Sequence, residues 1–288
     1  YRHLDRLTRV YEYMGPAWYQ REIEIPAAWK GKRIFLYFER THWLSSVYVG
    51  KEEVSKIDYI SIPHNHELTQ WLHPGKKELI TFCIDNRYQY DTHKWDHAHS
   101  EFTQINWNGV LGEIKLVAVD PVYVDDMQVY PDIKNKSIKV KMTVRNCTEH
   151  TASGKISFHV SGKDYRLQKE VPVTVTDSIT YIEEEMFLSK DIHLWNEFHP
   201  NLYTLDCKLT SSVEGQSYAH EKSTTFGMRE VEAGEDHIIL NGEPIHLRGT
   251  VENAVFPKTG YAPVDDASWE RVLRILKEYG MNHMRFHS

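Results

Sequence analysis

The chain has 288 residues, which is enough for about two domains of ordinary size. Its net charge of −7, from 34 Lys and Arg against 41 Asp and Glu, argues against a nucleic-acid-binding protein or one that docks on anionic membranes. No run of 18 apolar residues is present, and the opening YRHLDRLTRV lacks the apolar stretch of a signal peptide. We therefore expect a neutral or weakly charged partner, and neither nucleic acid nor membrane.

Short alternating strands run from residue 17 to about residue 120, within a first domain that we place at residues 1–121. The segments RIFLYFER, SVYVG, ELITFCID and EIKLVAVD are separated by the turn signals PAAWKGK, HPGKK and NWNGVLG. Regular strands with Gly and Pro between them, and almost no helical periodicity, favour an antiparallel sandwich or jelly roll.

One long segment interrupts this rhythm. Residues 85–109, DNRYQYDTHKWDHAHSEFTQINWNG, are polar and aromatic and too numerous for a simple hairpin loop. Loops of this length are usually functional or disordered, and the aromatic content argues against disorder. We therefore predict a functional loop.

A metal site is an alternative interpretation of this loop. Imidazole and carboxylate groups suit zinc, and the loop offers His93, Asp96, His97 and His99. Their spacing matches no closed structural zinc site, so we favour a solvated or sugar-contacting loop and predict no metal or other cofactor.

A second all-β domain is predicted over residues 122–228. It runs through PVYVDDMQVYPDI, KSIKVKMTVRN, GKISFHV, KEVPVTVT, LYTLDCKLTS and STTFGMREV, and about seven strands in such a length indicate an immunoglobulin-like sandwich. Alternation places Cys147 on a polar face and Cys207 on the apolar face with Leu205 and Leu209, which disfavours a disulfide between the two cysteines.

The pattern changes class over residues 229–288. A hairpin turning on Asn241 and Gly242 leads into the strand IHLRGT, the helix VDDASWERVLRILKEYG and the strand NHMRF. Asp265 or Asp266 can cap the helix, and Gly280 ends it. A strand, a helix and a second strand need a parallel sheet, so we predict the incomplete start of a (β/α)₈ barrel.

Four segments in this order resemble the N-terminal portion of glycoside hydrolase family 2, the β-galactosidases, β-glucuronidases and β-mannosidases. GPAWYQREIEIPAAWKGKRIFLYFERTHWLSSVYVGKEEV is similar to that family's sugar-binding jelly roll, although Gly50 stands where the family commonly has Asn-Gly. LWNEFHPNLYTL resembles the signature of its immunoglobulin-like domain. FGMREVEAGEDHIILNGEPIHLRGT and NHMRFHS resemble the entry to its barrel and the barrel's second strand.

The resemblance implies a retaining exo-β-glycosidase, most similar to β-galactosidases, that hydrolyses O-glycosidic bonds of carbohydrates. Both catalytic carboxylates of this family lie on later barrel strands, and a barrel takes roughly 250 residues, so this chain by itself is expected to be inactive. A periplasmic or secreted location is implied by the resemblance alone. The competing hypothesis is a non-catalytic carbohydrate-binding or adhesion module made of two sandwiches.

Two groups of residues are the candidate substrate-binding positions. Arg285 and His287 point the same way from the last strand, and the resemblance places them at the active-site mouth, although the family's Ser-His order is reversed here. The alternative for Arg285 is a structural role in binding barrel carbonyls. The second group is implied by the family's loop that reaches the sugar, with the alternative role of holding the loop backbone: Thr103, Gln104, Asn106 and Trp107. Glu252 and Asn253 end the first barrel strand and are weaker candidates.

Asn196 and Glu197 imitate the Asn-Glu pair that carries this family's acid/base. They lie within the immunoglobulin-like signature, in a turn before a strand, so we reject Glu197 as catalytic and expect an exposed turn residue. The expected partner is a carbohydrate substrate, and a second copy of the chain docking on the exposed barrel start is a further hypothesis.

Overall fold

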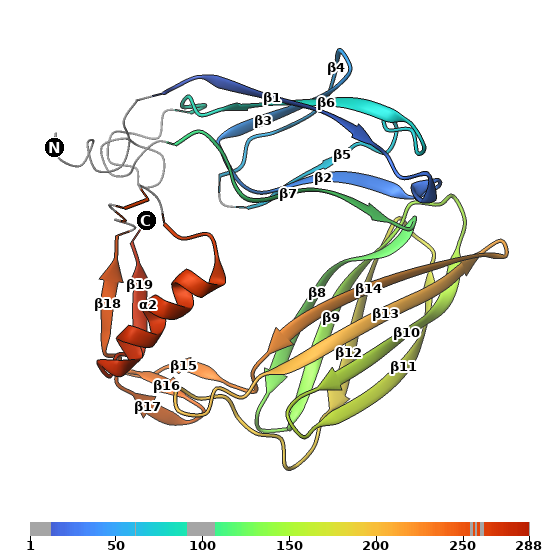
Figure 1. Ribbon diagram of the computed structural model, residues 1–288. Coiled ribbons are helices and arrows are strands. Elements are labelled where there is room, and N and C mark those ends of the chain that lie inside the picture. The colour runs from blue at the N-terminus through green and yellow to red at the C-terminus, as the bar shows by residue number, and fades with distance from the viewer. Residues whose placement is uncertain are drawn as a thin grey trace. The chain divides into compact units, whose positions relative to one another are not determined.

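A computed structural model describes residues 13–60, 62–90, 107–253, 256, 258–259 and 262–287 (Figure 1). The fold is mostly β, as predicted, with sandwich domains followed by a βα segment. The chain divides into two compact units, residues 119–246 and residues 1–118 with 247–288. This division places residues 229–246 with the sandwich, and the predicted domain limits stay a prediction. Within the described ranges, no helix has the length and apolar character that a bilayer crossing requires.

The jelly roll consists of two antiparallel sheets. The order β1-β6-β3-β4 forms one sheet and β5-β2-β7 forms the other. In β2 the residues Ile34, Leu36 and Phe38 are buried at every second position, because alternate side chains of a strand face the same core. The strands are β1 (Pro16–Glu24), β2 (Arg33–His42), β3 (Leu44–Val49), β4 (Glu52–Ile57), β5 (His64–Glu67), β6 (Lys77–Asp85) and β7 (Gly109–Val119), with a 3₁₀ turn η1 at Ala27–Trp29.

The second unit contains a sandwich of four and three strands. Its sheets have the orders β11-β10-β13-β14 and β12-β9-β8. Six of the strands correspond to the predicted segments, while β12, with the sequence ITYIEEEMF, is not among them because three consecutive glutamates mask its alternation. The strands are β8 (Val122–Asp132), β9 (Ser137–Asn146), β10 (Ala152–Ser161), β11 (Arg166–Val175), β12 (Ile179–Phe187), β13 (Tyr203–Val213) and β14 (Gln216–Phe226).

The sandwich core confirms the predicted alternation. Cys207 lies in the core with Leu205 and Leu209, whereas Cys147 is exposed. The three cysteines, each of them a described residue, form no disulfide with one another. Burial raises the pKa of the Cys207 thiol to about 12, so it behaves as a core residue and not as a nucleophile.

The LWNEF signature connects the sandwich to the next hairpin. The Trp195 backbone N–H donates to the carbonyl of Met228 over 2.9 Å, and the guanidinium of Arg229 lies 4.6 Å from the centre of the Trp195 ring. A Cβ on Gly227 would lie 2.9 Å from the Trp195 Cβ, so only glycine allows this close approach. The Asn241 side chain donates to the Trp195 carbonyl over 2.9 Å.

The hairpin turns where the sequence predicts. Strands β15 (Val231–Ala233), β16 (Ile238–Leu240) and β17 (Glu243–Ile245) are antiparallel, with Leu240 opposite Glu243. Asn241 and Gly242 have φ values of 55° and 88°, as a two-residue turn with both residues left-handed requires.

The last segment is a βα unit followed by a strand. Strand β18 (Gly249–Glu252), helix α2 (Asp266–Glu278) and strand β19 (His283–Phe286) follow in order, and the two strands are parallel. The predicted strand IHLRGT is divided, because β17 ends at Ile245 and β18 starts at Gly249. The Asp265 side chain caps the helix by accepting from the Ser268 backbone N–H over 2.8 Å, and Gly280 follows the last turn with a φ of 76°.

Candidate functional site

The parallel strands β18 and β19 bring four of the predicted site residues to one edge. The register pairs Val251 with Arg285 and Glu252 with Phe286. Beyond the last pair, the backbone N–H of His287 donates to the Glu252 carbonyl over 2.9 Å. Arg285, His287, Glu252 and Asn253 therefore lie at neighbouring positions at the carboxyl ends of the two strands.

Helix α2 distinguishes the two faces of this strand pair. The Phe286 ring meets the Trp269 ring edge to face, with 5.4 Å between centroids, so Phe286 is on the helix side. Because side chains alternate along a strand, Arg285 is on the face away from α2. In a (β/α)₈ barrel the helices lie outside, so this face corresponds to the barrel interior. Arg285 is exposed and His287 is half-buried.

The opposite end of the strand pair is fixed by a reciprocal contact. The Arg248 backbone N–H donates to the Asn282 side chain over 2.8 Å, and the Asn282 backbone N–H donates to the Arg248 carbonyl over 2.9 Å. A Cβ at Gly249 would lie 2.7 Å from the His283 carbonyl oxygen, so the strands approach closely there. These contacts fix the register that places Val251 opposite Arg285.

Arg285 and His287 share the face away from α2, whereas Glu252, opposite Phe286, is on the helix side. The residue types at this edge suit the recognition of a carboxylate and of sugar hydroxyls. A guanidinium presents a rigid set of donors that matches a carboxylate. Imidazole, carboxylate and amide groups together offer donors and acceptors to neighbouring hydroxyls. The geometry supplies positioning groups, and their contact with substrate stays a prediction.

The second predicted group lies mostly outside the described residues. Thr103, Gln104 and Asn106 are outside them, and Trp107 is the first residue of the 85–109 loop that is described after residue 90. The Trp107 carbonyl accepts from His42 Nδ1 over 2.7 Å and from the Asn86 side chain over 3.1 Å. The Trp107 ring stacks on the His42 ring with 5.0 Å between centroids, so this tryptophan anchors the base of the loop.

Asn86 holds the other chain segments at this loop base. It is fully buried, accepts from the Gly15 backbone N–H over 2.9 Å and donates to the Tyr13 carbonyl over 2.9 Å. Beside it, the Arg87 guanidinium binds the nearly buried Asp85 carboxylate through both oxygens, and these hydrogen bonds lower the pKa of Asp85. The sequence reasoning missed His42 and Asn86, because both owe their role to contacts with distant segments.

The metal hypothesis falls on residues that the structure does not describe. His93, Asp96, His97 and His99 lie outside the described ranges. Within those ranges, no three His, Cys, Asp or Glu side chains gather as metal ligands would.

Glu197 lies in a closed turn of the sandwich unit. The Asn196 side chain accepts from the backbone N–H groups of Phe198 and His199 over 3.0 and 2.7 Å, which is an Asx turn. Asn196 is therefore occupied by its own backbone. Glu197 is a half-buried turn residue, less exposed than predicted.

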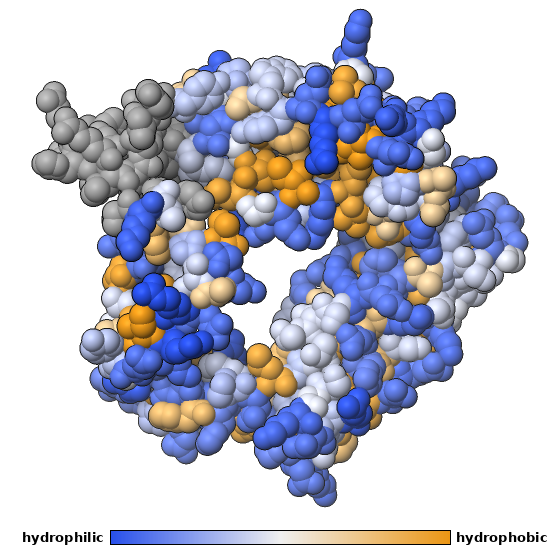
Figure 2. Space-filling view, in the orientation of Figure 1, coloured by the Kyte–Doolittle hydropathy of each residue, from blue (hydrophilic) through white to orange (hydrophobic). Residues whose placement is uncertain are grey.

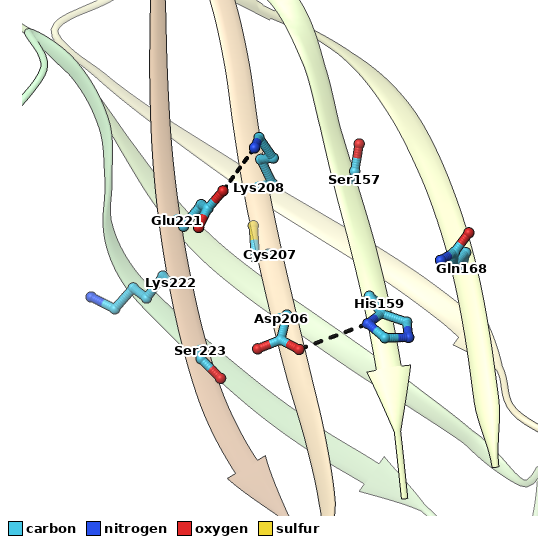
Figure 3. A pocket seen from close by; sticks show the side chains of 9 residues that line it. All are labelled: Ser157, His159, Gln168, Asp206, Cys207, Lys208, Glu221, Lys222 and Ser223. Carbon is cyan, nitrogen blue, oxygen red and sulfur yellow. Dashed lines mark hydrogen bonds and ion pairs between the residues drawn. The ribbon is translucent and has the colours of Figure 1, made fainter.

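A groove runs over the outer face of β10, β13 and β14 (Figure 3). Four of its charged side chains form two cross-strand pairs. His159 lies opposite Asp206 with 3.8 Å between Nδ1 and Oδ2, and Lys208 lies opposite Glu221 with 2.8 Å between Nζ and Oε1. This pairing is typical of a solvated sheet face.

Comparison with known proteins agrees with this arrangement of parts. Residues 122–229 match the family model described as glycosyl hydrolases family 2. A β-galactosidase of Thermoanaerobacter pseudethanolicus is 24% identical over 277 residues, which cover 95% of this chain and 36% of that protein. The chain thus spans about a third of the length of this relative.

Two solved structures have the same fold over nearly the whole chain. A Bacteroides uniformis β-glucuronidase 2 superposes with a TM-score of 0.79 at 19% identity, covering 99% of this chain and 35% of that one. A putative β-galactosidase from Bacteroides fragilis superposes with a TM-score of 0.81 at 18% identity, covering 98% of this chain and 43% of that one. The resemblance to the N-terminal portion of this family, and the fold class, are confirmed.

Proposed function

We propose that this chain works as the N-terminal part of a retaining exo-β-glycosidase, most similar to β-galactosidases, that hydrolyses O-glycosidic bonds. In this proposal the jelly roll, the immunoglobulin-like sandwich and the first βα unit position the substrate, and the catalytic carboxylates come from further barrel strands. The 288-residue chain then has no hydrolytic activity of its own.

The observation that carries the proposal is the parallel pairing of β18 with β19. It places Arg285, His287, Glu252 and Asn253 at the carboxyl ends of two adjacent strands, which is where (β/α)₈ enzymes build their active sites. A sandwich with a purely adhesive role has no need of a βα unit whose strand ends present these groups.

Each group has a distinct expected role. The Arg285 guanidinium orients a catalytic carboxylate by hydrogen bonds and favours its ionised form. His287 donates to a sugar hydroxyl, while Glu252 and Asn253 accept from or donate to neighbouring hydroxyls. None of these residues performs the bond cleavage.

A retaining reaction needs a nucleophilic carboxylate and an acid/base carboxylate about 5 to 5.5 Å apart. The first carboxylate attacks the anomeric carbon while the second carboxyl gives its proton to the departing glycosidic oxygen, which forms a covalent glycosyl-enzyme. The second carboxylate then takes a proton from the water that hydrolyses this intermediate and frees the first carboxylate. The solved Bacteroides uniformis enzyme is covalently bound to a cyclophellitol-6-carboxylate aziridine, and a covalent adduct of this kind supports the retaining assignment for this chain.

The long loop is the second part of the proposed site. The contacts at Trp107, His42 and Asn86 hold the described end of the loop. Thr103, Gln104 and Asn106, which lie outside the described residues, are the groups that contact the sugar in this proposal.

The test is a comparison of the chain with the longer protein that contains it. Both are assayed with an aryl β-galactoside and an aryl β-glucuronide, because the relatives carry both names. We expect turnover only by the longer protein, and faster turnover of the galactoside.

Two results would contradict the proposal. Turnover by the 288-residue chain that is lost in Glu197→Gln would show that the rejected glutamate is catalytic. A longer protein that binds galactosides and never hydrolyses an aryl β-glycoside would favour the adhesion module.

A further inference from the structure

Two fully buried histidines in the jelly roll are not among the residues assigned to substrate. His64 and His66 are on β5, and their side chains are 0% exposed. They lie at alternate positions with Leu68, so they face the same core. A buried imidazole is costly unless each ring nitrogen has a partner.

Every ring nitrogen of the pair has a partner. His64 Nε2 lies 2.7 Å from the Tyr59 carbonyl, and His64 Nδ1 lies 2.6 Å from Ser45 Oγ. Ser45 Oγ also lies 2.9 Å from His66 Nε2, and His66 Nδ1 lies 2.7 Å from Ser55 Oγ. The five groups form one continuous chain from β4 through β3 and β5 to the turn at residue 59.

The Tyr59 carbonyl, at one end of this series of hydrogen bonds, determines on which atom each hydrogen lies. A carbonyl only accepts, so His64 carries its hydrogen on Nε2, and neutral His64 must accept at Nδ1 from the Ser45 hydroxyl. Ser45 has then used its only hydrogen and accepts from His66 Nε2–H. His66 Nδ1 in turn accepts from the Ser55 hydroxyl. With both imidazoles neutral, the chain is complete in one direction only.

An added proton breaks this order. On His64 it would place two donors on Ser45 Oγ, and the displaced Ser45 hydrogen would find only the Ile57 carbonyl, 3.4 Å away. On His66 it would turn the Ser55 hydroxyl around and leave a charge beside the Phe38 ring, with 5.3 Å between ring centroids. Either charge would be in the core.

Few titratable groups act on the pair. Among the described residues, Asp58 is the carboxylate that favours a charge on His64, the Tyr59 ring packs against His64, and each imidazole lies 6.0 Å from the other. Burial lowers the pKa of His64 despite its bond to the Tyr59 carbonyl and the nearby Asp58, and burial together with His64 lowers the pKa of His66 to about 3.

This series of hydrogen bonds ends at Tyr59, in a turn that two further side chains also bind. The Trp43 indole donates to the Asp58 carbonyl over 3.3 Å, and the Tyr90 hydroxyl donates to the Asp58 carboxylate over 2.5 Å. The turn at residues 58–60 therefore connects the buried histidines to Tyr90, in the first part of the 85–109 loop.

We propose that the chain Ser55–His66–Ser45–His64–Tyr59 is an acid-sensitive clasp that holds the 58–60 turn on the jelly roll and releases it when the imidazoles take up protons. The direction of the pH effect on opening follows from which form binds the proton. The open form titrates near the ordinary value of about 6.5, and the closed form stays neutral, so opening becomes more favourable as the pH falls below that value. Above it, both forms are neutral and pH has no effect through these groups. This inference does not depend on which glycoside the protein acts on.

The first experiment determines, in the 288-residue chain, which ring nitrogen of each histidine carries the hydrogen. Long-range proton–nitrogen spectra of the 17 histidines should show two imidazoles that carry hydrogen on Nε2 and do not titrate between pH 8 and 5. The absence of two such rings, or a hydrogen on Nδ1 in either, would overturn the clasp.

The second experiment measures opening. Hydrogen exchange over residues 55–67, corrected for the intrinsic effect of pH, gives the local opening constant at pH 7 and pH 5. When the pH is lowered from 7 to 5, one imidazole that takes up a proton only in the open form raises the opening constant about 25-fold. Two such imidazoles raise it about 600-fold at most. An opening constant that is the same at both pH values would contradict the proposal.

The matched variants are His66→Gln and His73→Gln. The His73 ring is on the surface, with its side chain 58% exposed and Nδ1 2.7 Å from Glu78, so its replacement should leave the pH effect unchanged. Replacing His66 should reduce the effect to about 25-fold at most. If His66→Gln does not fold, the spectra of the unaltered chain still decide between the outcomes.

Discussion

The immunoglobulin-like sandwich and the β18–α2–β19 segment differ in how far they bury their apolar side chains. The sandwich encloses a core that both of its sheets fill, with Ile156, Phe158 and Leu209 at 1% exposure or less. Helix α2 has no buried residue at all, and Leu273 on its apolar side is 45% exposed. Figure 2 shows hydrophobic side chains on the surface in the region of this segment. The sandwich is held by its own packing, whereas the segment with the candidate site is held by backbone pairing and a helix cap.

The difference in burial has a physical cause. A sheet-on-sheet sandwich buries both inner faces against each other, but a βα unit needs neighbouring units to cover its helix and its strands. Among the described residues, the segment that carries Arg285 and His287 is therefore less buried than the sandwich. Three predictions test this contrast, in order of decreasing effect.

The largest effect is expected in the sandwich core. Phe158→Ala removes a ring that is 1% exposed, and it should cost about 3 to 5 kcal/mol of unfolding free energy because a cavity is left behind. Phe187→Ala removes the same ring from a position that is 58% exposed, and it should cost well under half as much. Urea unfolding with hydrogen exchange in β10 and β13 measures both. Equal costs would mean that this core does not hold the sandwich together.

The next effect concerns activity in the longer protein. Arg285→Ala should lower kcat/KM by roughly 10- to 100-fold with little change in Tm, since a hydrogen bond to a charged group is worth about 1.5 to 3 kcal/mol. Arg274→Ala is the control, because Arg274 is exposed on α2 and its guanidinium lies 3.0 Å from Glu270. A loss of stability by Arg285→Ala with unchanged kinetics would instead assign Arg285 the structural role.

The smallest effect concerns the helix cap. Asp265→Ala removes the acceptor for the Ser268 N–H, so amide exchange in the first turn of α2 should become roughly fivefold faster. Asp266→Ala is the neighbouring control and should leave that turn nearly unchanged. A similar acceleration in both variants would show that general charge near the helix start, and not the cap, holds this end.

Much of the fold follows from periodicity alone. The alternation in KSIKVKMTVRNC places Ile138, Val140, Met142 and Val144 in the core and Cys147 outside, as the structure has it. The Asn241–Gly242 turn, the Asp265 cap and the Gly280 stop are also local, because each depends on the φ or the hydrogen bond of one or two residues. For the candidate site, the sequence predicted the residue types and the strand that carries Arg285.

Tertiary structure decided which segments meet. The pattern predicts a parallel sheet for the two strands of the βα segment, but only the folded structure sets the register that brings the His287 N–H to the Glu252 carbonyl, across 34 intervening residues. The segment PHNHELT looks like a polar turn, yet His64 and His66 are buried because Ser45 and Ser55, from strands earlier in the chain, satisfy their nitrogens. A sequence pattern shows which side chains share a face. The hydrogen-bond partner that offsets the desolvation of a buried polar side chain comes from elsewhere in the chain, and only the folded structure brings the two together.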